Sequence, residues 1–197
     1  MTQSSNRLTL TLFLIRAILC TVLSMDTYDC IRTKLDVREF DSKPVPAEVK
    51  LKVLEAARLT QSGMNSQDWR FILVQDPTRI RVLANDSTTG QWVSGANFAV
   101  IVLINPKFGF HLIDAGRAVQ DMQLAAWNYG VVSRVFTGVK ESELRRDFAI
   151  PQNLAHAITA GFGYPVKKIL GKKNRHQLNE VAYLDKYGNP LEASQVT

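Results

Sequence analysis

The pattern of apolar and polar positions predicts four strands, one of them buried on both faces. Residues 98–104 (FAVIVLI) are apolar at every position, and Asn105 and Pro106 follow them directly. A strand without polar positions is typical of the centre of a sheet that is covered on both faces. The other predicted strands are residues 70–75 (RFILVQ), 131–136 and 157–161.

Helical periodicity and helix-end signals predict five helices around these strands. Asp76 and Pro77 are a capping residue and a first-turn proline, and they predict a short helix through Ala84. The longest predicted helix covers 111–129 and ends at Gly130; its small side chains would let another helix approach closely. The remaining helices are expected at about 26–34, 46–58 and 140–148, with an extended segment at 37–45. Residues 25–197 are therefore expected to form one domain.

Composition narrows the class of protein. The chain has 197 residues, of which 46% are hydrophobic and 21% charged, as in an ordinary globular domain. Two cysteines, Cys20 and Cys30, are too few for a disulfide framework and lack the spacing of a zinc site, so no metal site is predicted. A reducing compartment, the cytoplasm, is therefore expected.

The formal charge of +6 is partly due to the first 24 residues, which carry Arg7 and Arg16 and no acids. Without them, 22 basic residues face 18 acidic ones, an excess of four. No base-stacking or zinc-finger pattern accompanies this excess, so a nucleic-acid partner is not predicted. A phosphate ligand or simple solubility accounts for it equally well.

The apolar segment at 8–23 predicts neither a membrane anchor nor an export signal. Arg16 interrupts it, it is shorter than the roughly 20 residues that span a bilayer, and no small-residue cleavage site follows. Met25 begins an ordinary helix pattern. We therefore expect Met25 to be the true initiator and treat residues 1–24 as a doubtful extension.

No side-chain catalytic motif stands in the chain. It has no Gly-x-Ser-x-Gly, no His-Glu-x-x-His, no Walker loop and no Rossmann glycine pattern. Its three histidines are scattered without ligand spacing and are expected to be structural or surface residues: His111, His156 and His176.

Five polar or glycine-rich segments stand where predicted elements end. They are 34–40 (KLDVREF), 61–70 (QSGMNSQDWR), 136–138 (FTG), 161–165 (GFGYP) and 172–175 (KKNR). As an ordered set over about residues 26–190, they resemble the FMN-dependent nitroreductase family. Its pattern begins with Arg-Arg-Ser-x-Arg-x-Phe, continues with a Pro-Ser-x-x-Asn-x-Gln-Pro-Trp loop, and ends with Gly-Tyr-Pro and a basic segment. Taken singly, each segment is equally compatible with an ordinary loop or a solvated charged surface.

The resemblance implies an α+β fold, a three-layer α/β/α sandwich with a central, mostly antiparallel sheet flanked by helices. It also implies an obligate homodimer with both flavins at the interface. The long helix at 111–129 would then pack against its twin. Residues 178–197 have too few apolar positions to fold alone, so this C-terminal extension is expected to wrap the dimer partner.

The resemblance also implies which residues bind the cofactor's phosphate. Lys34 and Asp36 match the first and third positions of the Arg-Arg-Ser triplet, which hold phosphate and ribityl groups. Arg38 matches the later basic position beside the pyrimidine end, and Lys173 and Arg175 match the basic residues that complete the phosphate site. A lysine offers a point charge where arginine offers a bidentate fork.

The aspartate in this box departs from the family serine. A carboxylate beside a phosphate is repelled unless a cation compensates it, so we expect Arg38 or Arg32 to pair with Asp36.

The loop after the second predicted helix matches the family segment that contacts the flavin, partly from the partner subunit. Its matching residues are Ser62, Gly63, Asn65 and Gln67. Gly63 would let the backbone approach the ring. Gln61 and Asp68 replace the family's two prolines, which is expected to loosen the loop.

Two further residues match a family Gly-Gly pair after the third strand, namely Thr137 and Gly138. In the family a backbone N–H there points at flavin N5. Trp92 and the 108–110 segment are candidate aromatic walls of the pocket, although core packing explains them equally well.

The implied activity is that of an FMN-dependent NAD(P)H oxidoreductase. Flavin N5 takes a hydride from NAD(P)H and passes electrons to a nitroaromatic, a quinone or another small acceptor, with ping-pong kinetics. No acid–base residue is needed, and Arg38 is the electrostatic candidate for stabilising the reduced ring. Two alternatives remain. Asp36 also resembles the Arg-Arg-Asp-x-Arg box of dimethylbenzimidazole synthase, which fragments reduced FMN, and a flavin-binding protein without turnover fits as well.

Overall fold

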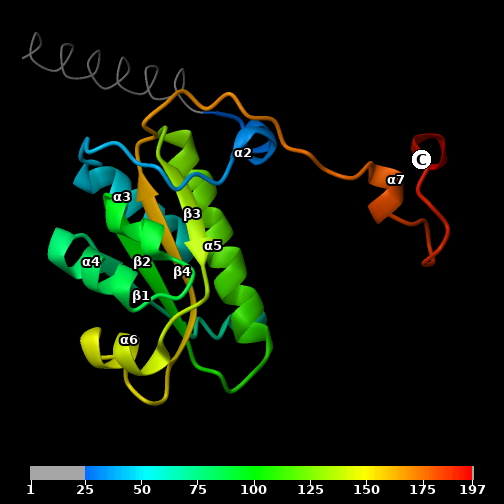
Figure 1. The fold of residues 1–197 in the computed structure, drawn as a ribbon. Helices are drawn as coiled ribbons and strands as arrows, with labels where there is room; N and C mark the ends of the chain where they lie inside the picture. The colour runs from blue at the N-terminus through cyan, green and yellow to red at the C-terminus, as the bar shows by residue number, and fades with distance from the viewer. Residues whose placement is uncertain (1–24, 197) are drawn as a thin grey trace, which may run out of the picture.

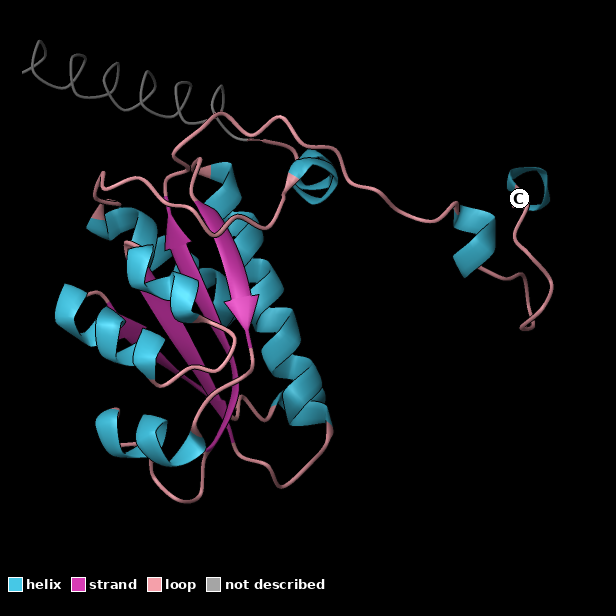
Figure 2. Cartoon of the chain, viewed as in Figure 1, coloured by secondary structure: helices cyan, strands magenta, loops and turns pink. Residues whose placement is uncertain are grey.

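The computed structural model describes residues 25–196, in which a four-stranded sheet lies between two layers of helices (Figures 1 and 2). The strands are β1 (Trp69–Val74), β2 (Phe98–Ile104), β3 (Val132–Phe136) and β4 (Ala155–Gly163). They are arranged in the order β1-β2-β4-β3, and all three pairings are antiparallel. The prediction of an α+β sandwich around an antiparallel sheet is confirmed.

Strand β2 is the centre of the sheet, and every one of its seven residues is buried. Its side chains alternate between two hydrophobic clusters, because successive residues of a strand point to opposite faces. Phe98, Val100 and Val102 pack on one side, and Ala99 and Ile101 pack on the other. The absence of polar positions is therefore explained by two covering helical layers.

Helices α3 (Ala47–Leu59) and α5 (Phe110–Asn128) cover the first face of the sheet. The second face is covered by α4 (Pro77–Asn85), the short 3₁₀ segment η2 (Gln91–Gly95) and α6 (Glu141–Asp147). Figure 1 shows α5 on one side of the sheet and α4 and α6 on the other. Asp76 caps α4 by accepting hydrogen bonds from the backbone N–H groups of Thr78 and Arg79.

Strand β4 is longer than the predicted 157–161 segment, and its glycines explain the difference. A side chain at Gly161 would come within 2.8 Å of Trp92, and one at Gly163 within 2.9 Å of Phe40. These glycines permit close packing inside the strand and do not end it. The candidate aromatic Trp92 is thus a packing residue, half-buried and edge-on to Phe136 at 5.8 Å between ring centroids.

Both ends of the described chain lie outside the sandwich. Helix α2 (Thr27–Thr33) packs at the C-terminal end of α5, where the Trp127 indole N–H donates to Thr33 Oγ1 at 3.0 Å. The C-terminal segment stays against the domain as far as Lys173, which donates to α2, and beyond it α7 (Leu178–Val181) and the last turn, η3 (Ala193–Gln195), stand apart from the sandwich (Figure 1). Its apolar side chains face solvent, with Tyr187 88% exposed.

Within residues 25–196 the structure contains no helix with the length and hydrophobicity to cross a bilayer. The apolar segment at 8–23, and with it the expectation that Met25 is the initiator, lies outside the described residues.

Candidate functional site

Basic residues from the two ends of the domain meet beside α2. Lys34 follows α2 directly, and its ammonium lies 2.5 Å from Asp36 Oδ1. Lys173 arrives from the C-terminal segment and donates a hydrogen bond to the carbonyl of Ile31 in α2. Arg175 and Lys34 are both close enough to act on the charge of Lys173. We call Lys34, Asp36, Lys173 and Arg175 the cationic cluster.

The cationic cluster is electrostatically unfavourable as it stands. Burial lowers the pKa of Lys173, and the positive charges of Arg175 and Lys34 lower it further, opposed by Asp36. The Lys34 side chain is only 11% exposed. Three cations against one carboxylate leave two net positive charges, and like charges this close together destabilise one another. Such a cluster fits a bound dianion, and a phosphate monoester carries about −1.5 to −2 at neutral pH.

The prediction that Arg38 or Arg32 pairs with Asp36 is wrong. Asp36 pairs with Lys34, whereas Arg32 lies on α2 and engages Asp29 three residues earlier at 2.8 Å. The reason is local: the helix places Arg32 and Asp29 on one face, and the chain turns after Lys34. Asp36 is then held beside β3 by a bridge to Ser133.

Arg38 lies on the rim of a cavity of about 310 Å³ between residues 36–39 and residues 165–171. Its side chain is exposed. Two segments far apart in the sequence, the N-terminal box and residues 165–171 just before the basic segment, thus line one cavity. Five of the predicted site residues are brought to this end of the domain: Lys34, Asp36, Arg38, Lys173 and Arg175.

The 61–68 loop, which carries Ser62, Gly63, Asn65 and Gln67, follows α3 and contains the 3₁₀ turn η1 (Gly63–Asn65). Met64, Asn65 and Gln67 have left-handed backbone conformations, with φ of 54°, 53° and 51°. Each such residue costs about 1 kcal/mol or more and persists only when its surroundings fix it. Ser62 Oγ accepts from the backbone N–H of Gln67 at 3.1 Å and closes the loop.

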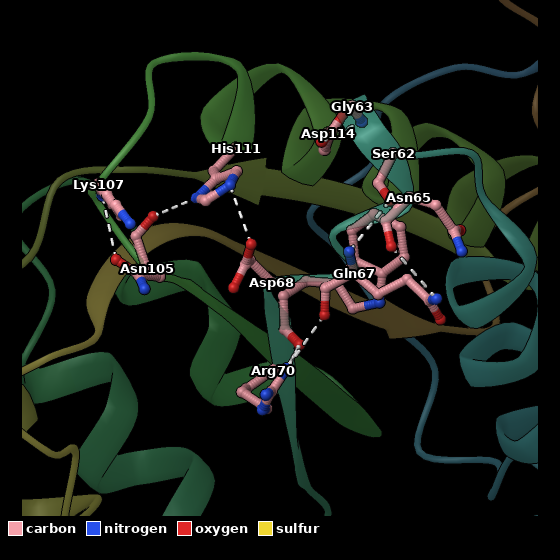
Figure 3. Close-up of polar contacts among 11 residues, drawn as sticks. Ser62, Gly63, Asn65, Gln67, Asp68, Arg70, Asn105, Lys107, His111 and Asp114 are labelled. Carbon is pink, nitrogen blue, oxygen red and sulfur yellow. Dashed lines mark hydrogen bonds and ion pairs between the residues drawn. The ribbon is translucent and has the colours of Figure 1, made fainter.

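Contacts from α5 reach this loop at three points, and its looseness relative to a loop with the family's two prolines stays a prediction. Arg117 donates to Gln61 Oε1 at 3.0 Å. The backbone N–H of Gly63 donates to Asp114 Oδ2 at 2.9 Å. His111 Nε2 lies 2.9 Å from Asp68 Oδ2 (Figure 3), at an angle too bent for a regular hydrogen bond.

Sequence reasoning predicted His111 as a structural or surface residue, and it missed the contacts with this loop that three α5 residues make: His111, Asp114 and Arg117. Their spacing of three places them on one face of a helix, which is the only signal that the sequence carries. His111 is 2% exposed, and its Nδ1 lies 2.6 Å from the carbonyl of Asn105. Among residues 25–196, no group of three or more His, Cys, Asp or Glu side chains could hold a metal ion.

Two predicted glycines have explanations inside the subunit. A side chain at Gly63 would come within 2.5 Å of the Phe110 ring, and one at Gly138 within 2.4 Å of Thr88 Oγ1. The carbonyl of Gly138 accepts from the backbone N–H of Thr88 at 2.9 Å. The Thr137–Gly138 pair lies just beyond the end of β3, while Asp36 bridges to the beginning of that strand.

The 61–68 loop and the cationic cluster lie at opposite ends of α5. Gly63 contacts Asp114 near the start of the helix, and Thr33 contacts Trp127 near its end. Thirteen residues separate the two contact points, which at 1.5 Å per residue is about 20 Å. One subunit therefore does not bring the predicted loop residues to the predicted phosphate residues.

Comparison with known proteins supports the resemblance of the sequence segments. The family model described as "Nitroreductase family" matches residues 31–107. A Methanothermobacter thermautotrophicus protein named "Putative NADH dehydrogenase/NAD(P)H nitroreductase" is 30% identical over 155 residues, which cover 74% of this chain and 81% of the relative. A protein of the same name from Archaeoglobus fulgidus is 30% identical over 145 residues, or 68% of this chain and 83% of that relative.

Solved structures share the fold. One from Parabacteroides distasonis, with the same protein name, superposes with a TM-score of 0.76 at 20% identity and covers 82% of this chain and 98% of its own. An FMN-dependent nitroreductase from Clostridium difficile R20291 superposes with a TM-score of 0.74 at 19% identity, covering 80% and 98%. With relatives that match along most of their length and the same sandwich fold, the chain belongs to the nitroreductase family.

Proposed function

We propose that the protein is an FMN-dependent NAD(P)H oxidoreductase of the nitroreductase type. The cationic cluster is the observation that carries this proposal. Lysines from segments at opposite ends of the domain converge, and their mutual repulsion is relieved when a dianion such as the FMN phosphate sits among them. Membership of the family, whose relatives are named for NADH and NAD(P)H chemistry, supports the same activity.

Each residue of the N-terminal box has a distinct task in this proposal. Lys34, Lys173 and Arg175 bind the phosphate, and Asp36 orients Lys34 through their 2.5 Å ion pair. Arg38, on the cavity rim, provides positive charge toward the pyrimidine edge. When bound, the flavin supplies hydride acceptance and release at N5, so the protein contributes placement and charge, and no side-chain base is required.

The proposal includes a homodimer, because the 61–68 loop lies about 20 Å along α5 from the cationic cluster of its own subunit. A twofold arrangement of antiparallel α5 helices would place the loop of one subunit beside the cationic cluster of the other. The outward face of α5 favours such a contact, since Ile113 is 66% exposed and nothing lies within 4 Å of a Cβ built on Gly116. The exposed C-terminal segment would then cover the partner.

An anaerobic titration tests this function. Protein reconstituted with FMN is mixed with NADH and, separately, with NADPH, and the visible absorbance of the flavin is followed. We expect one of the two to bleach the flavin, and a quinone or a nitroaromatic to restore the colour, with parallel lines in double-reciprocal plots. A protein that binds FMN but is bleached by neither nicotinamide would be a flavin carrier and not this enzyme.

One observation favours a second candidate. Over 53 residues the chain is 42% identical to 5,6-dimethylbenzimidazole synthase from Rhodospirillum rubrum, although the match covers only 27% of this chain. Asp36, the residue by which the N-terminal box resembles that synthase, forms an ion pair with Lys34. Incubating the protein with excess reduced FMN in air tests this candidate, and the absence of dimethylbenzimidazole among the products would dispose of it.

A further inference from the structure

The 61–68 loop is gripped from one side by a single face of α5. His111, Asp114 and Arg117 follow one another at intervals of three residues, so they share a face of the helix. Arg117 contacts the beginning of the loop at Gln61, and His111 contacts its end at Asp68. We call His111, Asp114 and Arg117 the α5 clamp.

The middle of the loop is fixed by a buried carboxylate. Asp114 is 4% exposed and accepts from the backbone N–H of Gly63, while Arg117 Nη1 lies 3.7 Å from its other oxygen. A buried carboxylate without such partners would be strongly unfavourable. The same carboxylate therefore needs the loop in place, and the loop needs the carboxylate.

His111 contacts the residues that flank two strands. Its Nδ1 contacts the carbonyl of Asn105, directly after β2, and its Nε2 faces Asp68, directly before β1 (Figure 3). The ring is almost fully buried and packs edge-on against Phe108 and Phe110. Since rings packed in this way have little freedom, His111 is a rigid support for Asp68.

The backbone of the loop requires such support. Met64 and Gln67 are left-handed residues of types that seldom adopt this conformation, and Asn65 between them is left-handed as well. A proline at either end could have restrained the loop locally, but Gln61 and Asp68 occupy those positions. Both of these residues are contacted by the α5 clamp, so tertiary polar contacts take over the restraint.

We propose that the α5 clamp is a positioning device, which holds the strained 61–68 loop in its cofactor-binding shape through Gln61, Gly63 and Asp68. This inference rests on the proposed function, in which Ser62, Asn65 and Gln67 contact the flavin. The clamp residues act through the loop and do not themselves touch the cofactor. The α5 clamp lies on the helix that is proposed to pair in the dimer. The same helix would therefore fix the shape of the loop and make the subunit contact.

The test uses the full-length protein and two clamp-breaking variants, Asp68→Ala, which removes every polar atom that faces His111 Nε2, and Arg117→Met. Arg117→Lys keeps a cation beside Asp114 and serves as the conservative variant. Arg81→Met is the matched control, because Arg81 is exposed on α4, across the sheet from α5. Backbone hydrogen exchange of residues 62–67 is measured without flavin, and the FMN dissociation constant and thermal midpoint are measured separately.

We expect both clamp-breaking variants to raise exchange in the loop at least about fivefold. The FMN dissociation constant should rise by about fivefold or more, because a loop that must be ordered on binding costs affinity. The thermal midpoint should fall by only about 2–4 °C, since Asp114 keeps its hydrogen bond from Gly63 and the sheet and the core are untouched. Arg117→Lys and Arg81→Met should behave like the wild type in all three measurements.

Unchanged loop exchange in both variants would overturn the inference, as would faster exchange without any loss of FMN affinity. An equal loss in Arg117→Lys and Arg117→Met would also overturn it, because the retained cation is expected to preserve the contact. If the wild-type protein binds no FMN, the proposed function fails, and the positioning role fails with it. If the wild type binds FMN and the variants change neither exchange nor affinity, only the positioning role fails. The FMN affinity of the wild type therefore distinguishes the two failures.

Discussion

Replacing Lys173 by glutamine tests the role of the cationic cluster. In the flavin-free protein this lysine is held among like charges, with its pKa lowered by burial and then by Arg175 and Lys34. The variant removes that repulsion and one hydrogen bond to the Ile31 carbonyl. These effects on folding oppose each other, so the stability of the free protein should change by no more than about 0.5 kcal/mol.

The effect on FMN binding should be much larger. A hydrogen bond to a charged group contributes about 1.5–3 kcal/mol. Lys34 and Arg175 remain in the variant and keep part of the attraction, so we take about 2 kcal/mol, which corresponds to a roughly 30-fold weaker dissociation constant. The pKa of Lys173 is lowered, so this lysine loses its proton at a lower pH than an ordinary lysine does. Deprotonation removes a cation from the phosphate site, and FMN binding to the wild type should therefore begin to weaken at that lower pH.

The assay is a fluorescence-quenching titration of FMN at fixed ionic strength. Lys172→Gln is the control: it removes the same charge from the neighbouring residue, and Lys172 is not among the groups that shift the pKa of Lys173. We expect less than a roughly threefold effect for the control, as is usual for one exposed charge. Equal losses in the two variants, or no loss in Lys173→Gln, would refute the assignment of Lys173 to the phosphate site.

Three further predictions concern the subunit contact and the buried titratable groups. Gly116→Leu should convert the dimer to a 22.1 kDa monomer in size-exclusion chromatography. Gly95→Leu is the control, because nothing lies within 4 Å of a Cβ at either glycine, and it should leave the dimer intact. A stable Gly116→Leu dimer would contradict the proposed α5 contact. Asp86→Asn should stabilise the protein by about 1 kcal/mol at pH 7 in urea unfolding, because burial and then Asp147 raise the pKa of Asp86 and disfavour its charged form. The gain should vanish at acidic pH, where Asp86 is neutral, and a constant gain would count against this cause. Burial lowers the pKa of His156, so the unfolded chain takes up a proton there before the folded protein does, and stability should fall as the pH drops below about 6.5. His156→Gln should reduce this dependence of the unfolding free energy on pH. An unchanged dependence would assign it to other groups.

Much of the sandwich could be predicted from local patterns. The all-apolar 98–104 segment matches β2 without error, because burial on both faces leaves no polar position. Asp76 before α4 and Pro77 at its first position mark the beginning of that helix equally well. Strand β4 was predicted too short because Gly161 and Gly163 look like strand breakers, whereas they admit the rings of Trp92 and Phe40 from distant segments.

In the candidate site, too, some residues could be predicted from the sequence and others depend on contacts between distant segments. Lys34, Arg38 and the basic segment could be singled out by sequence, since the segments that carry them resemble those of the FMN-dependent nitroreductase family. The partner of Asp36 and the α5 clamp could not, because both depend on which segments the fold brings together. Gln61 and Asp68 in place of prolines predict a looser loop, and nothing in the sequence indicates that α5 contacts both of them.

The most direct test of the account compares FMN with riboflavin, which has the same ring and ribityl chain but no phosphate. Both ligands are titrated into the purified protein at pH 7.5, and the dissociation constants and stoichiometry are measured. We predict one FMN per chain and a dissociation constant at least about 100-fold weaker for riboflavin, since the cationic cluster holds only the phosphate. Equal affinities for the two ligands, or no binding of FMN, would contradict the account.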